Sequence, residues 1–190
     1  MYPQVQLKDN IDNILFVIQN DNYITQKQKT LLISFLDYFK KHDLNFLQEN
    51  YVSIFDRQKK FSLYLFEHIH GDSRERGTAI IDLQNLYKSY NFDVSDGKEL
   101  PDYIPLFLEF ISLIEEKDAC NMIGEIINLI SIIGKRLELI NNEYSIIFYV
   151  LESLSIVKPD NLIVEKIVNK DKNLDNEINI DKEWEEEKIF

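Results

Sequence analysis

Residues that interrupt helices are scarce in this sequence, with 5 Gly and 4 Pro among 190 residues. Because both residue types mark turns and end regular elements, their scarcity favours long, uninterrupted elements. Hydrophobic residues make up 45% of the chain and charged residues 28%, which is typical of a globular protein rather than a disordered one. The length is that of about one ordinary domain.

Cysteine is also nearly absent, and the only one, Cys120, cannot form a disulfide within the chain. The N-terminus lacks the basic stretch followed by an apolar run that marks a signal peptide. The longest strongly apolar run, Ile126 to Ile133, is interrupted by Asn128 and Ser131, and it is shorter than the roughly 20 residues that span a bilayer. We therefore expect a cytoplasmic protein in a reducing compartment, without stable membrane insertion.

Positive charge is in short supply: the formal net charge is -12 and the pI is about 4.7. A surface of this sign repels the phosphates of nucleic acids and the head groups of anionic lipids, so nucleic acid is not expected as a partner. It attracts a basic segment of another protein, although solubility alone explains a charge of this size.

Apolar residues recur at helical spacing through most of the chain, and this pattern predicts an all-α fold of about seven or eight helices. Thr25 and Gln28 fit a capping box at the start of one helix. A short final helix is expected from Leu162 to Val168. The two cleanest stripes predict a core made of Ile123, Ile126, Ile127, Ile130, Tyr144, Ile147, Phe148 and Leu151.

The segment from 56 to 71 has no helical stripe. Its apolar run, Phe61 to Phe66, is expected to be a buried connection between helices, because no second strand candidate exists to pair with it. Glu67, His68 and His70 follow. The two histidines share a face only in extended backbone, and no cysteine or third histidine lies near, so we expect hydrogen-bonded histidines in a turn rather than a metal site.

A second distinctive block, 99–106, places two carboxylates and two prolines at the entrance of a helix. Asp102 is positioned to cap that helix, and the first-turn proline does no harm because its missing N–H is not needed there. A rigid, acidic helix entrance explains this composition, and it would equally suit a peptide with basic residues. Spacing alone does not make the two carboxylates a catalytic pair.

From Asn169 onward the sequence is polar and charged, and it ends near Trp184-Glu185-Glu186-Glu187. We divide the chain into a helical domain, 1–168, and an acidic C-terminal tail, 169–190. The tail is expected to be less ordered than the domain, with Trp184 as its one anchor.

Several of these blocks occur together in one known family. The stretch from Leu63 to Ser73, LYLFEHIHGDS, continues as RERGTAIIDLQNLYKSY, and ELPDYIPLFLEF and DKEWEEEKIF follow later. In this order they resemble the NarJ type of molybdoenzyme chaperone, also called the nitrate reductase delta subunit. The family's Glu-x-x-Asp-His motif corresponds to Glu99, Asp102 and Tyr103, so tyrosine stands here where the family has histidine.

The resemblance implies a TorD-like, single-domain helical bundle that is not an enzyme. It also implies a partner, the immature catalytic (alpha) subunit of respiratory nitrate reductase, bound chiefly through its N-terminal segment. The chaperone would hold that subunit competent for insertion of the molybdenum cofactor and an iron–sulfur cluster. No metal and no cofactor of its own is expected. The expected peptide-binding residues are Glu67, His70, Glu99, Leu100, Pro101, Asp102, Tyr103, Pro105 and Leu106.

Two other hypotheses stay open at the level of sequence. One is a maturation chaperone for a different molybdoenzyme, such as a dimethyl sulfoxide or formate enzyme. The other is a metal-dependent helical enzyme that uses His68 and His70. The stretch from Gly71 to Gly77 offers no further catalytic motif, because it lacks the Lys-Ser/Thr pair of a phosphate loop and the spacing of a nucleophile elbow.

Overall fold

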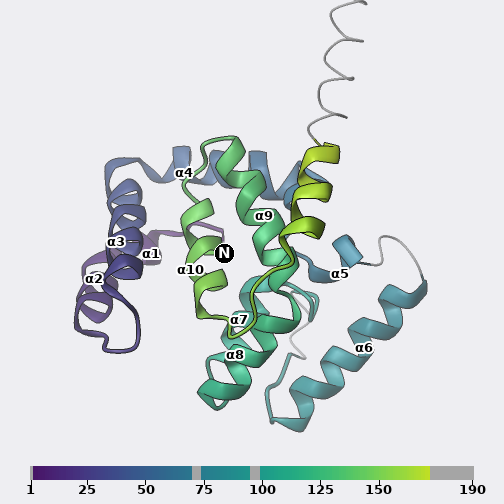
Figure 1. Cartoon of the computed structure of the whole chain (residues 1–190). Coiled ribbons are helices and arrows are strands. Elements are labelled where there is room, and N and C mark those ends of the chain that lie inside the picture. Colours follow the sequence, from purple (N-terminus) through teal and green to yellow (C-terminus); the bar gives the residue numbers. More distant parts are fainter. Residues whose placement is uncertain (1, 70–73, 95–98, 172–190) are drawn as a thin grey trace, which may run out of the picture.

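The computed structural model describes residues 2–69, 74–94 and 99–171 of the chain. Within these ranges the protein is built of helices, and the only β pairing is an isolated antiparallel bridge between Tyr64 and Tyr103 (Figure 1). The all-α class expected from the periodicity is confirmed.

The first half of the described chain contains α1 to α5, with one π-helical and one 3-10 turn between α4 and α5. Their bounds are α1 Val5–Asp9, α2 Ile11–Asn20, α3 Gln26–Lys41, α4 Leu44–Tyr51, the π turn Val52–Asp56, the 3-10 turn Lys59–Phe61 and α5 Leu65–Ile69. The capping box at the start of α3 is present, since Thr25 accepts from the Gln28 backbone and the Gln28 side chain accepts from the Thr25 backbone.

The second half contains five further helices and a final helical stretch at 161–171, close to the helix expected at 162–168. The bounds are α6 Arg74–Ser89, α7 Ile104–Ile111, α8 Glu116–Glu125, α9 Ile127–Leu139 and α10 Ser145–Leu154. The described residues thus hold more helices than the seven or eight expected. One reason is that the single stripe predicted across 123–133 is divided at Ile126, whose φ of -107° and ψ of 12° separate α8 from α9.

The centre of the molecule is the pair α9 and α10, which lie side by side in Figure 1. Gly134 of α9 permits their close approach, because a Cβ at this position would lie 3.0 Å from the Cβ of Phe148. The core predicted from the two stripes is confirmed: five of its eight members are buried and the other three pack against them. The buried five are Ile123, Ile127, Ile130, Tyr144 and Phe148, and the partly buried three are Ile126, Ile147 and Leu151.

The final helical stretch, 161–171, lies along α9 on the side away from α10 (Figure 1). Val164 and Val168 are buried against Ile132, and Arg136 forms an ion pair with Asp171 at 2.6 Å. Residues 169–171 of the expected tail belong to this stretch, whereas Trp184 lies outside the described residues. In the same described ranges, no helix combines the length and the apolar character needed to cross a bilayer.

The apolar run before α5 is the buried connection expected from the sequence. Phe61, Leu63 and Leu65 are all buried, and the run is divided between the 3-10 turn, a short extended stretch and the start of α5. The extended stretch contains Tyr64, which forms the isolated bridge to Tyr103. The segment is therefore not a sheet strand, and its backbone pairs with only one other segment of the described chain.

Candidate functional site

Two segments that are distant in sequence form a hydrogen-bonded contact between α5 and α7. The Leu65 N–H donates to the Asp102 carbonyl at 2.9 Å, and the Ile104 N–H donates to the Leu63 carbonyl at 2.8 Å. We call this contact, formed by residues 63–67 and 99–104, the latch. It brings together the two sequence blocks from which the expected binding site was drawn.

Asp102 lies at the centre of the latch and is fully buried. Its Oδ2 accepts from the Phe66 N–H at 3.1 Å, whereas its Oδ1 has no hydrogen-bond partner among the described residues. Burial raises the pKa of this carboxyl, and the Phe66 N–H and the charge of Arg76 oppose the rise only in part. The expectation that Asp102 caps the following helix is wrong, because the side chain caps α5 instead and the N-cap of α7, Tyr103, makes no side-chain cap.

Glu67 and His68 stabilise the other half of the latch. The Glu67 carboxylate accepts from the Ser62 hydroxyl and forms an ion pair with Arg76 at 3.3 Å. The His68 Nε2 lies 2.8 Å from the Ser62 carbonyl, to which it can donate, and burial lowers the pKa of this imidazole. His68 is therefore the hydrogen-bonded histidine expected in this turn. His70 lies outside the described residues.

The expected site residues of the second block lie together but differ in exposure. Glu99 and Leu100 are exposed, Tyr103, Pro105 and Leu106 are half-buried, and Pro101 and Asp102 are buried. A buried hydrogen bond fixes Pro101, because its carbonyl accepts from the Tyr87 hydroxyl at 2.7 Å. Only part of the expected set is therefore available to a ligand in solution, and Asp102 is not in that part.

A hollow of about 210 Å³ opens beside the latch. We call it the tyrosine hollow, and its lining residues are Tyr2, Tyr51, Phe55, Asp56, Leu63, Tyr64, Glu99 and Tyr103. Hydrogen bonds fix its walls: the Tyr64 hydroxyl donates to Glu99 Oε2 at 2.9 Å, and the hydroxyls of Tyr51 and Tyr103 are 3.0 Å apart. Burial raises the pKa of Tyr51 and of Tyr64, so both are neutral phenols at physiological pH.

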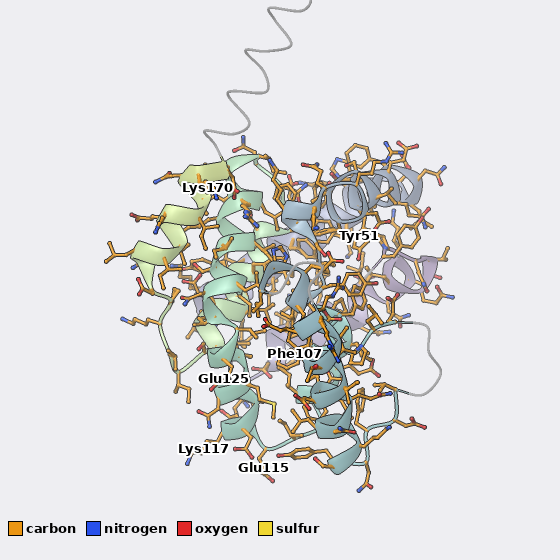
Figure 2. The ribbon with its side chains drawn as sticks, turned by 90° about the vertical axis from the view of Figure 1, so that its right-hand side faces the viewer. Tyr51, Phe107, Glu115, Lys117, Glu125 and Lys170 are labelled. Carbon is orange, nitrogen blue, oxygen red and sulfur yellow. The ribbon has the colours of Figure 1, made fainter. Side chains whose placement is uncertain are left out.

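Six residues of the tyrosine hollow were not expected at the site from the sequence: Tyr2, Tyr51, Phe55, Asp56, Leu63 and Tyr64. Tyr51, labelled in Figure 2, packs its ring on Phe55, with ring centres 4.9 Å apart. Asp56 ends the π-helical turn, which no periodicity marks. The one available signal was at Leu63 and Tyr64, because both lie within the block that carries the family resemblance.

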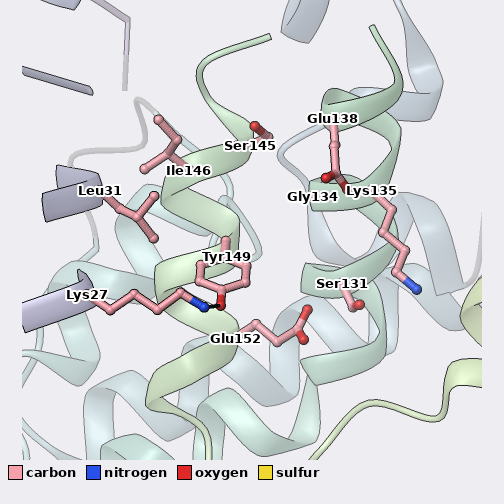
Figure 3. A pocket seen from close by; sticks show the side chains of 10 residues that line it. All are labelled: Lys27, Leu31, Ser131, Gly134, Lys135, Glu138, Ser145, Ile146, Tyr149 and Glu152. Carbon is pink, nitrogen blue, oxygen red and sulfur yellow. Dashed lines mark hydrogen bonds between the residues drawn. The ribbon is translucent and has the colours of Figure 1, made fainter. Parts of the chain in front are cut away.

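A second and larger hollow, of about 440 Å³, lies between α3, α9 and α10 (Figure 3). Its lining carries both signs of charge, with Lys27 and Lys135 against Glu138 and Glu152. Lys27 donates to the Tyr149 hydroxyl across the mouth. No residue of this hollow belongs to the expected site.

Metal binding finds no support in the described ranges, where no three His, Cys, Asp or Glu side chains are grouped to hold an ion. His68 is instead engaged with the backbone of Ser62. The latch and its hollow thus present hydroxyls, aromatic rings and two carboxylates, which is the composition of a binding surface for a polar or cationic group.

The described chain is a helical protein, and sequence comparison identifies its family. The profile of the nitrate reductase delta subunit matches residues 21–140, a range that contains both halves of the latch. The chain belongs to the nitrate reductase delta subunit family.

Three relatives carry names that describe a function. The chain is 33% identical over 143 residues to the nitrate reductase molybdenum cofactor assembly chaperone NarJ of Escherichia coli K12, across 75% of this chain and 60% of that protein. It is 33% identical over 142 residues to the probable chaperone NarW of the same strain, and 29% identical over 150 residues to a probable NarJ of Bacillus subtilis. The chain spans about 60% of the length of the two Escherichia coli relatives, and it covers 80% of the Bacillus protein.

Proposed function

We propose that this protein is a non-catalytic, cytoplasmic assembly chaperone for respiratory nitrate reductase. It binds the immature catalytic subunit, chiefly through that subunit's N-terminal segment, and holds it competent for insertion of the molybdenum cofactor and an iron–sulfur cluster. The observation that carries the proposal is the match of the nitrate reductase delta subunit profile across 21–140. The names of the relatives support it, since each is named as a nitrate reductase molybdenum cofactor assembly chaperone, NarW and the Bacillus protein as probable ones.

We further propose that the helices form a single TorD-like bundle over 1–168, followed by an acidic tail over 169–190. The continuous core from Ile11 to Phe148 supports one bundle, because it joins α2, α3, α4, α7, α8, α9 and α10 in a single apolar cluster. The tail's charge supports its separation from that cluster.

The client segment binds, in this proposal, at the exposed side of the latch. Glu99, Leu100 and Tyr103 reach solvent there, and the partly buried Pro105 and Leu106 extend the surface along α7. Glu67 and Asp102 do not contact the client in this proposal. They stabilise the latch, since both carboxylates accept hydrogen bonds within it. A surface fixed in this way loses little entropy when a peptide binds to it.

The test is a pull-down with this chain as bait and the nitrate reductase catalytic subunit from the same genome as prey. We expect capture of the intact subunit and loss of capture when its N-terminal segment is deleted. Capture that survives the deletion contradicts the role of that segment. Failure to capture the intact subunit, or preferential capture of a dimethyl sulfoxide or formate enzyme, contradicts the assignment to nitrate reductase.

A second measurement addresses the chaperone role itself. Cells without this protein should accumulate nitrate reductase catalytic subunit that lacks molybdenum, which elemental analysis of the purified subunit detects. Normal molybdenum content in such cells would show that the protein is not needed for cofactor insertion. Re-expression of the chain is the matched control.

A further inference from the structure

The tyrosine hollow combines two carboxylates with aromatic walls. Asp56 and Glu99 both line it, and no lysine, arginine or histidine is among its described lining residues. The described lining of the hollow therefore carries negative charge only, and it attracts a cationic ligand, while Arg57 and Lys59 line an adjoining hollow that shares Asp56 with this one.

The rings around the hollow are inclined to one another rather than stacked. Tyr2 and Tyr51 meet edge to face, with ring centres 5.7 Å apart and planes at 86°, and Tyr64 and Tyr103 are tilted by 37° at 5.3 Å. Rings at such angles form walls on several sides of a space. The face of an aromatic ring carries partial negative charge, so walls of this kind attract a cation and hold its alkyl stem.

We infer that the tyrosine hollow binds one cationic side chain, a lysine or an arginine of the client's segment. A space of about 210 Å³ accommodates a single side chain rather than a helix or a nucleotide. An anion would meet two carboxylates, and a purely apolar group would remove water from those carboxylates without replacing it by a charge or a donor. The source of the cation rests on the function proposed above, whereas the chemistry of the hollow does not.

The hydrogen bonds of the walls leave acceptors for such a ligand. The Tyr64 hydroxyl donates to Oε2 of Glu99 and so holds that carboxylate beside the Tyr64 ring. The other oxygen, Oε1, can accept a hydrogen bond from the ligand. Asp56 is exposed at the end of the π-helical turn. An ammonium or guanidinium group in the hollow can therefore be bound by both carboxylates and by the rings together.

The hollow can be tested without any client. The full chain is titrated with ethylguanidinium chloride, and with ethylurea as the uncharged molecule of the same shape, while tyrosine ring signals are followed by NMR. A parallel titration uses butylammonium and butanol. We expect the two cations to shift the signals of Tyr51, Tyr64 and Tyr103 with saturation, and the two neutral molecules to shift them little.

Three variants locate the site. Glu99→Gln and Asp56→Asn should each weaken cation binding by about two- to fivefold, and the double variant by about tenfold, since each removes one partly solvated charge interaction. Glu125→Gln removes the same charge from exposed helix α8, well away from Tyr51 in Figure 2, and should leave binding unchanged. Equal binding of ethylurea and ethylguanidinium, or an unchanged double variant with an intact NMR spectrum, overturns the inference.

A peptide of the client's N-terminal segment separates this inference from the proposed function. Replacement of its arginines by citrulline and of its lysines by norleucine should weaken binding to the natural chain but not to the Asp56→Asn, Glu99→Gln double variant. If the natural peptide binds and these replacements change nothing, the inference fails and the chaperone proposal stands. If the small cations fill the hollow but the catalytic subunit is not captured, the chaperone proposal fails and the cation site stands.

Discussion

The α9–α10 pair and the latch are held together by different kinds of interaction. Between α9 and α10 the contacts are apolar, with Ile130 and Ile133 fully buried and the helices closest at Gly134. In the latch the contacts are directed hydrogen bonds around a buried carboxyl, that of Asp102. Apolar attraction has no preferred direction, so close packing, as at Gly134, fixes the spacing of the two helices. In the latch, hydrogen bonds also fix the direction in which each group points.

The two regions therefore contribute differently, one to stability and the other to the geometry of the binding site. The helical pair supplies stability in proportion to the apolar area that it buries. The latch contributes less apolar area, but it positions Tyr64, Glu99 and Tyr103 around the tyrosine hollow. A change in the pair should therefore alter the free energy of unfolding most, and a change at the rim of the hollow should alter binding most.

The largest effect on stability is expected from Ile130→Ala in α9. Ile130 is 0% exposed, so the truncation leaves a cavity in the core and should lower the free energy of unfolding by about 2–5 kcal/mol. Urea denaturation followed by circular dichroism measures the loss. Leu113→Ala, at a side chain that is 70% exposed, is the control and should change stability by less than about 0.5 kcal/mol. Similar losses in both variants would show that α9 is not the centre of the core.

The sequence predicted the α9–α10 pair well because the apolar spacing that marks a buried helix face lies within each helix. Ile127, Ile130 and Ile133 recur at helical spacing, and so do Tyr144, Phe148 and Leu151, so each stripe identifies a buried face without knowledge of its partner. The break at Ile126 was missed because the apolar pattern continues across it.

The latch could be predicted only in part because its contacts are long-range. The sequence block 99–106 was identified correctly as structured, but the role of Asp102 was assigned to the nearest helix. Its true partner, Phe66, lies 36 residues earlier in the chain. Nor does any spacing rule indicate that Tyr51 and Asp56 line one hollow with Glu99, since this depends on how α4 and the π turn lie against the segment before α7.

The second largest effect is expected at the centre of the latch. Asp102→Ala removes the acceptor for the Phe66 N–H and should destabilise the protein by about 1–3 kcal/mol, since a buried donor then has no partner. Asp102→Asn keeps an acceptor oxygen and should cost less. Thermal and urea unfolding of both variants measure the difference. Equal losses in the two variants would mean that the carboxylate itself, which both variants lack, and not the acceptor oxygen that asparagine keeps, is what matters at this position.

The same carboxyl gives the latch a pH dependence. Burial raises the folded pKa of Asp102 above its ordinary value of 3.8, so the folded state binds a proton that the unfolded state has released. Its contribution to stability is complete below that value and is lost as the pH rises through the raised folded pKa. Natural protein should therefore lose stability relative to Asp102→Asn across this window when urea unfolding is repeated at increasing pH. A constant difference would show that the folded and unfolded pKa values are equal.

A smaller effect is expected from the hydroxyl pair on the wall of the tyrosine hollow. The Tyr51 and Tyr103 hydroxyls are 3.0 Å apart, and a net hydrogen bond of this type contributes about 0.5–1.5 kcal/mol. Tyr51→Phe, Tyr103→Phe and the double variant form a thermodynamic cycle that isolates this coupling. Strictly additive losses would show that the two hydroxyls do not interact in solution.

The smallest effect on stability is expected at the rim, from Glu99→Gln. Glu99 is exposed, and its hydrogen bond from the Tyr64 hydroxyl can be kept by the amide oxygen of glutamine, so the free energy of unfolding should change by less than about 0.5 kcal/mol. Unfolding in urea, with Glu125→Gln as the control of equal charge, checks this. The same substitution is expected to weaken cation binding. Glu99→Gln would then lower binding with little effect on stability, whereas Ile130→Ala lowers stability most. If Glu99→Gln instead destabilises the fold as strongly as Asp102→Ala, the rim is part of the latch's support, and any loss of binding that it causes cannot be assigned to the carboxylate.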